Sequence, residues 1–125
     1  MASKTNSMVM SGQTVLMSER VEFINWLKDD MGLSDKYARD IYCRCKRVEK
    51  QIDKNLVNST SNKKGFESLQ GRIKEYSQLS TGNVKACYAL TGDLRAAVRK
   101  YAQFKYPLAA KDYRHARVYA VEEVK

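Results

Sequence analysis

Two amphipathic helices joined by a tight turn at Gly32 constrain the fold of this chain more than any other feature. Apolar side chains recur at helical spacing on both sides of the turn. The first helix carries Val21, Phe23, Ile24, Trp26, Leu27 and Met31, and the second carries Tyr37, Ile41, Cys45, Val48 and Ile52. Gly32 can adopt the left-handed conformation that ends a helix, and Ser34 can cap the next one. The spacing therefore predicts a first helix capped by Ser18, a Gly-Leu-Ser corner and a second, longer helix.

Two further helices are predicted after a polar break at residues 57–64. The first covers about 65–79, where Gly71 can let a neighbouring helix approach closely. The second covers about 83–105 and ends before Pro107, because proline cannot continue a helix. A kink at Gly92, or two separate helices there, is the alternative. Since no strand-like alternation appears, we expect an all-α fold, a compact bundle of four to five helices.

The chain of 125 residues is long enough for one compact domain and hardly for two. Residues 1–17 are rich in Ser, Thr, Asn and Gly and show no apolar period, so they are predicted to form a flexible N-terminal arm, partly ordered near Val15 to Met17. Residues 18–106 form the predicted helical domain. Residues 107–125 are expected to form a C-terminal helical tail with a weak apolar period.

The charge of the chain is strongly basic, with 23 Lys and Arg against 14 Asp and Glu and a net charge of +9. Such an excess favours a polyanionic partner, either nucleic acid or an anionic membrane surface, and solubility without any partner is the alternative. The charge is also uneven along the chain. Residues 18–31 are acidic overall, whereas 32–57 and 80–106 are basic.

No residue cluster with catalytic or metal-binding spacing stands out. Cys43, Cys45 and Cys87 lack the paired spacing of a zinc site, and His115 is the only histidine. We expect the three cysteines to be packing or surface residues, and we expect no metal, no cofactor and no enzyme activity. A Cys87–His115 nucleophile pair is a remote alternative. With no secretory signal and no long apolar run, a reduced, cytoplasmic setting without a membrane span is predicted.

The tyrosines divide into two predicted groups. Those that fit the apolar sides of helices are expected in the core: Tyr37, Tyr76, Tyr88 and Tyr101. Those that are freer to contact a partner are Tyr42, Tyr106 and Tyr119.

The motif F-x-x-W-L, followed by G-L-S and a tyrosine early in a long helix, resembles the SAM-like core-binding domain of tyrosine recombinases (phage integrases). The residues that carry this resemblance are Phe23, Trp26, Leu27, Gly32, Leu33, Ser34 and Tyr42. Residues 93–104, DLRAAVRKYAQF, are similar to the final helix of that domain, so the resemblance covers about residues 19–105. It implies a domain of four to five helices that clamps one side of duplex DNA, while a separate catalytic domain grips the other side.

By this resemblance, basic residues of the helix after Gly-Leu-Ser and of the last helix would lie on DNA. They are Lys36, Arg39, Arg44, Lys46, Arg47, Arg95 and Arg99. In the polar break, Lys63 and Lys64 are further candidates for phosphate contact. The prediction requires the cationic sides of both helices to form one continuous positive surface. The chain departs from the family at R-H-A-R around His115, which is not the His-x-x-Arg spacing of the catalytic half, so at most a lone DNA-clamping domain is expected.

Two functions therefore remain open. The first is a small basic helical protein that contacts the phosphate backbone of duplex DNA. The alternative is a protein–protein interaction module, an accessory or inhibitor protein in a mobile-element or phage setting, whose basic face meets an acidic partner. The sequence predicts neither the DNA site nor the oligomeric state.

Overall fold

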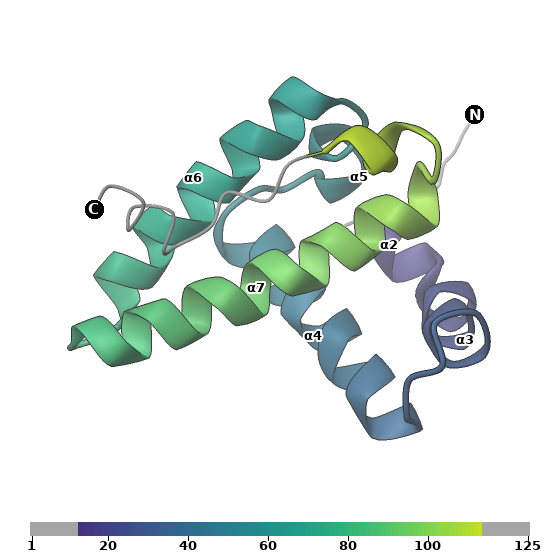
Figure 1. Cartoon of the computed structure of the whole chain (residues 1–125), viewed down its shortest axis with the longest axis horizontal. Coiled ribbons are helices and arrows are strands. Elements are labelled where there is room, and N and C mark those ends of the chain that lie inside the picture. Colours follow the sequence, from purple (N-terminus) through teal and green to yellow (C-terminus); the bar gives the residue numbers. More distant parts are fainter. Residues whose placement is uncertain (1–12, 114–125) are drawn as a thin grey trace.

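The computed structural model describes residues 13–113, which form six α-helices and one short 3₁₀-helix and contain no β-strand (Figure 1). Three long helices form the framework: α4 (Asp35–Gln51), α6 (Lys63–Ser80) and α7 (Val84–Lys105). The shorter elements are α2 (Val15–Ser18), α3 (Arg20–Asp29), α5 (Leu56–Ser59) and the 3₁₀-helix η1 (Ala109–Asp112). The expected all-α class is confirmed for these residues.

Each long helix begins at a capping side chain. Ser34, Asn62 and Asn83 each accept a hydrogen bond from the backbone N–H three residues further on, at 2.8–3.1 Å. Gly32 has a φ of +72°, so it takes the left-handed conformation that the α3–α4 corner requires. The corner at Gly32 and the cap at Ser34 are therefore confirmed.

The long helix α7 lies at the centre of the arrangement. It packs against α4 and forms a helical hairpin with α6. Near the C-terminal end of α7, it also contacts α3 (Figure 1). An aromatic group closes this last junction: the ring of Phe23 lies 5.3 Å from that of Tyr101 and 5.1 Å from that of Phe104, between ring centroids. The hydrophobic core also includes the fully buried side chains of Leu16, Leu27, Ile41, Val48, Leu56, Phe66, Leu69, Ile73, Leu94 and Val98.

The prediction that Ser18 caps the first helix is wrong. Ser18 is the last residue of α2, which begins after Thr14, and Glu19 is the N-cap of α3. Leu16 in α2 is fully buried, so this part of the predicted arm belongs to the core. The rest of that arm, residues 1–12, lies outside the described residues.

The buried side of α4 is rotated from the predicted one. Tyr37 is 41% exposed, whereas Tyr42 is only 5% exposed and lies under the guanidinium of Arg20, 5.6 Å from the ring centroid. Ala38 is also buried, and its small side chain lets the helix turn this flank toward the core. The predicted roles of Tyr37 and Tyr42 are therefore reversed.

The other tyrosines divide as follows. Tyr101 is fully buried as expected, Tyr76 is half-buried, and Tyr88 is 49% exposed, which contradicts its predicted place in the core. The hydroxyl of Tyr106 donates to the backbone carbonyl of Val57 at 2.8 Å. Tyr119 lies outside the described residues.

Helix α7 runs unbroken to Lys105, so a single helix is confirmed and the alternative of two helices is wrong. After Pro107 the chain turns back through η1. Tyr113 then stacks on Phe66 at 4.9 Å between ring centroids, and its hydroxyl donates to the carbonyl of Thr60 at 2.7 Å. Residues 114–125, which hold the rest of the predicted tail helix, lie outside the described residues.

The polar break holds more structure than predicted. Helix α5 extends into it, and Leu56, the first residue of α5, is fully buried. Helix α6 already begins at Lys63, so Lys63 and Lys64 lie exposed in its first turn and not in a loop. A Cβ at Gly71 would have no other atom within 4 Å, so the close helix approach expected there is absent.

Candidate nucleic-acid interface

The outer face of α4 carries a row of cations. Helical spacing places Lys46, Arg47 and Lys50 opposite the buried residues Ile41 and Cys45, and the three cations are exposed. Lys54, which is also exposed, continues the row just past the end of the helix. These four residues are called the α4 cationic row below.

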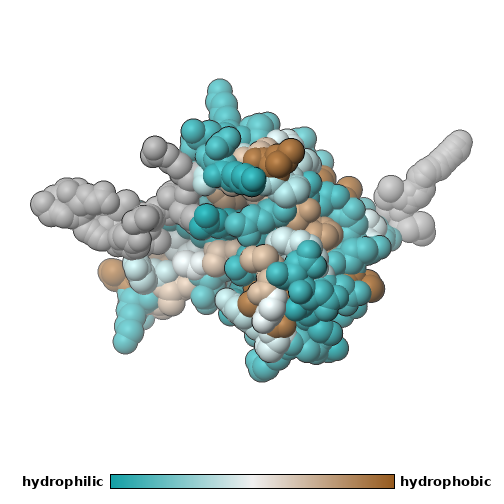
Figure 2. Space-filling model, turned by 45° about the vertical axis from the view of Figure 1, so that its right-hand side comes forward, coloured by the Kyte–Doolittle hydropathy of each residue, from teal (hydrophilic) through white to brown (hydrophobic). Residues whose placement is uncertain are grey.

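No exposed acid interrupts this row. Every exposed residue from Cys43 to Asn55 is either cationic or uncharged, and the two acids of that stretch, Glu49 and Asp53, are turned inward. Within residues 13–113, none of the four cations makes an ion pair. Figure 2 shows a different face of the molecule, which is mostly hydrophilic and on which hydrophobic side chains form separate small groups.

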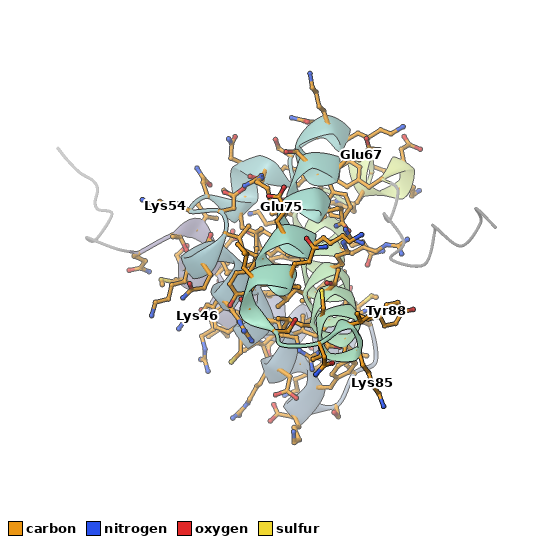
Figure 3. All side chains as sticks on the ribbon, turned by 90° about the vertical axis from the view of Figure 1, so that its left-hand side faces the viewer. Lys46, Lys54, Glu67, Glu75, Lys85 and Tyr88 are labelled. Carbon is orange, nitrogen blue, oxygen red and sulfur yellow. The ribbon has the colours of Figure 1, made fainter. Side chains whose placement is uncertain are left out.

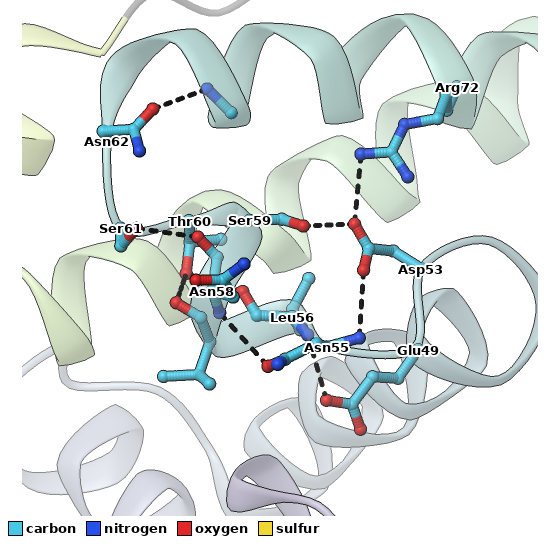
Figure 4. A network of polar contacts seen from close by, with 12 residues as sticks. Glu49, Asp53, Asn55, Leu56, Asn58, Ser59, Thr60, Ser61, Asn62 and Arg72 are labelled. Atoms are coloured by element: carbon cyan, nitrogen blue, oxygen red, sulfur yellow. Dashed lines mark hydrogen bonds and ion pairs between the residues drawn. The ribbon is translucent and has the colours of Figure 1, made fainter.

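Glu49 is held inside by a polar network that joins α4 to α5 (Figure 4) and by a hydrogen bond to Thr14, the residue before α2. Its carboxylate accepts a hydrogen bond from the hydroxyl of Thr14 at 2.7 Å and another from the N–H of Leu56 at 3.2 Å. Burial raises the pKa of Glu49, and these two hydrogen bonds oppose that rise only in part. The carboxylate therefore contributes to joining these segments and presents little charge to solvent.

Asp53 lies in the same network, but its pKa is shifted in the opposite direction from that of Glu49. Its carboxylate accepts hydrogen bonds from the hydroxyl of Ser59 and from the N–H of Asn55, and it forms an ion pair of 3.0 Å with Arg72. Burial alone would raise the pKa of Asp53, but these donors outweigh it and hold the pKa below its ordinary value. The charge of Asp53 is thus satisfied internally by Arg72 on α6 rather than by a lysine of the α4 cationic row.

Arg47 is the one member of the row that another helix holds in place. Its Nε donates to the hydroxyl of Tyr76 on α6 at 2.9 Å, and its guanidinium lies over the ring of Tyr76, 5.4 Å from the centroid. This hydrogen bond uses one of the five N–H donors of the guanidinium, so four remain for an anion.

In the N-terminal half of α4, two of the cations form ion pairs with acids of the same helix. Lys36 pairs with Asp40 at 3.5 Å and Arg39 pairs with Asp35 at 3.1 Å, both at the i, i+4 spacing. Arg44 is half-buried. Of the predicted contacts on this helix, Lys46 and Arg47 are therefore the exposed cations without a neighbouring carboxylate.

The predicted placement of Arg95 on an exposed side of its helix is wrong. Arg95 is only 6% exposed, and its Nη2 and Nε donate to the carbonyl of Gln70 on α6 at 2.8 Å and 3.2 Å. Its long apolar stem lets it follow the buried side of α7 while the head group reaches a backbone acceptor. Burial lowers the pKa of Arg95. Arg99 is half-buried, so the i, i+4 pair does not form an exposed cationic surface.

Helix α6 interrupts the single positive surface that the sequence predicts. Arg47 and Arg95 contact α6 at residues six positions apart, which corresponds to about 120° around its axis. The outer side of α6 carries the exposed acids Glu67 and Glu75. In Figure 3 the labelled lysines of the α4 cationic row lie on one side of α6, and Lys85 of α7 lies on the other.

The cysteines do not come together. Cys43 is exposed, while Cys45 is buried and its Sγ donates to the carbonyl of Ala97 at 3.3 Å. Burial raises the pKa of the Cys45 thiol. In the described part of the chain no group of His, Cys, Asp and Glu residues could hold a metal ion. His115, and with it the Cys87–His115 alternative, lies outside the described residues.

None of the helices between residues 13 and 113 combines the length and the apolar character that a membrane span needs.

No family model matches the chain, and neither a curated protein nor a solved structure is significantly similar to it. The surface chemistry of the described residues therefore carries the functional proposal. The predicted contacts omit Lys50 and Lys54, although their steps of four residues from Lys46 were a usable signal that they share its side.

Proposed function

We propose that this chain binds the phosphate backbone of duplex DNA through the α4 cationic row. The observation that carries the proposal is the set of exposed residues between Cys43 and Asn55, which includes four cations and no acid. Cations without a carboxylate partner can neutralise phosphates and release condensed counterions, which is the main source of sequence-independent affinity. Backbone contacts of this kind position a protein on DNA without reading its sequence.

The resemblance to integrase core-binding domains favours the same helix. In that family the helix after the Gly-Leu-Ser corner lies on DNA, and in this chain the corresponding helix is α4. We therefore propose a lone domain of the core-binding type, with contacts from α4 alone. The last-helix contact of the family is left out, because Arg95 is buried here.

A salt titration tests this proposal. If the row neutralises four phosphates, the slope of log K against log salt for a random-sequence duplex should be about −3 to −4. The double variant Lys46→Gln, Lys50→Gln should make the slope shallower by about two. Fluorescence anisotropy of a labelled duplex measures both quantities.

The matched control removes two charges from the other half of the same helix. The double variant Lys36→Gln, Arg39→Gln has the same net charge, but its two positions pair with carboxylates in the native protein. We expect it to change the slope much less. Equal effects of the two double variants would reject the α4 cationic row as the site. No duplex binding at micromolar protein would reject DNA binding and leave this face for an acidic protein partner.

A further inference from the structure

A groove of about 430 Å³ lies between α6 and α7, beside the turn that joins them. Its α6 wall includes Lys74, Gln78 and Thr81, and its α7 wall includes Val84 and Tyr88. This volume falls in the range of sites that enclose a small ligand or a few side chains of a peptide.

The groove residues of α7 lie on the same side of this helix as its buried residues. Val84 and Tyr88 share a side with Thr91, Val98 and Ala102, because the steps between them are three, four or seven residues. From Thr91 onward this side is covered by the rest of the protein. Val84 is 86% exposed and Tyr88 is 49% exposed, so the apolar side extends past the part of the helix that is covered.

Two buried polar side chains on this side of α6 lack hydrogen-bond partners among the described residues, although neither of them lines the groove. Ser77 lies between the groove residues Lys74 and Thr81 on the same side of α6, is fully buried, and has a hydroxyl without a hydrogen-bond partner within residues 13–113. Two turns earlier on this side, the side-chain amide of Gln70 is equally buried and unpaired in that same range.

The charge of the groove is one-sided. Among residues 13–113, no Asp or Glu lines the groove and Lys74 makes no ion pair. Lys85, next to Val84 in the sequence, is exposed at the same end of α7 (Figure 3). The groove therefore offers apolar side chains on α7 and an ammonium group on α6. A ligand that carries both a large apolar group and a carboxylate is complementary to it.

We propose that this groove binds a short acidic segment of a partner protein. One large apolar side chain of the segment packs against Val84 and Tyr88, and a neighbouring carboxylate pairs with Lys74. A second copy of this chain fits less well, because its net charge of +9 opposes self-association. Since the α4 cationic row lies on the other side of α6 from Lys85, this site is separate from the proposed DNA surface (Figure 3).

The probe is a short fluorescein-labelled peptide of glutamates and leucines, measured by anisotropy against the whole chain. We expect a dissociation constant of about 100 µM or below, and binding at least about tenfold weaker when glutamine replaces glutamate or alanine replaces leucine. The double variant Val84→Ser, Tyr88→Ser should also bind at least about tenfold more weakly. Leu79→Ser is the matched control, because Leu79 is 88% exposed on the same hairpin but does not line the groove, and its binding should be unchanged.

Amide chemical-shift mapping on the unsubstituted protein gives a readout that does not depend on variants. Shifts confined to Lys74, Gln78, Val84, Tyr88 and their neighbours support the proposal. Shifts centred on the α4 cationic row, or no saturable binding up to about 1 mM peptide, would overturn it. The Lys46→Gln, Lys50→Gln variant should keep peptide binding, so the two proposals can fail separately. Loss of duplex binding in the Val84→Ser, Tyr88→Ser variant would instead assign the groove to nucleic acid.

Discussion

Replacing Tyr101 with phenylalanine should stabilise this protein. Tyr101 is the largest fully buried side chain of the described residues, and its hydroxyl has no hydrogen-bond partner among them. Its ring packs edge-on against Phe23 on α3. Burial raises the pKa of the hydroxyl, which therefore stays protonated. The substitution removes an unpaired polar group and keeps the aromatic contact.

The expected gain follows from two opposing contributions. A buried hydroxyl without a partner costs about 1–3 kcal/mol relative to its solvated state. Removing one oxygen leaves a small void of roughly 20 Å³, which at about 24 cal/mol per Å³ costs about 0.5 kcal/mol. The free energy of unfolding should therefore rise by about 0.5–2.5 kcal/mol. For a domain of this size, each kcal/mol corresponds to about 4–8 °C in Tm.

The matched control is Tyr113→Phe. Tyr113 is also buried, but its hydroxyl donates to the carbonyl of Thr60 at 2.7 Å. The same chemical change there should lower the free energy of unfolding by about 1 kcal/mol, since a satisfied hydrogen bond is lost. Urea unfolding followed by circular dichroism, with comparable m-values, measures both changes. A loss of stability of more than about 1 kcal/mol in Tyr101→Phe would show that its hydroxyl has a partner, and would refute the reasoning.

Three further predictions use the same unfolding assay. Gly65→Ala should destabilise the protein by about 1–3 kcal/mol, because the new Cβ would lie 2.7 Å from the carbonyl oxygen of Ser59. Gly71→Ala in the same helix should stabilise it by about 0.5–1 kcal/mol, because its Cβ would have no atom within 4 Å. A change of the same sign in both variants would contradict this prediction. Gly32→Ala should cost about 1–2 kcal/mol through its positive φ alone, so an unchanged midpoint would argue against a left-handed turn there. Burial raises the pKa of Glu49, so the folded state binds the proton of this carboxyl more tightly than the unfolded state does. The free energy of unfolding, compared with that of Glu49→Gln, should be greatest below the unfolded pKa, near 4.5, and should fall as pH rises through the higher folded pKa. The reverse trend would exclude a raised pKa.

The sequence named two residues of the candidate site, whose contact with DNA stays a prediction, and missed two others. Lys46 and Arg47 were expected on DNA and are exposed on α4, and the same helical spacing was enough to add Lys50 and Lys54. Arg95 was misplaced, because a long side chain with an apolar stem can follow either the buried or the exposed side of a helix. Which side it follows depends on a backbone acceptor of another helix, the carbonyl of Gln70.

By itself the sequence determined the helices α3, α4, α6 and α7, the cap at Ser34 and the corner at Gly32. Those features depend on groups within a few residues of one another, such as the Ser34 side chain and the N–H three residues later. Only the tertiary structure decided how far each helix is rotated about its axis. Helical periodicity leaves both flanks of an apolar stripe open to burial, and packing against the other helices selects the flank of α4 that carries Ala38. That rotation buries Tyr42 and exposes Tyr37, and the position of α6 separates the cations of α4 from those of α7.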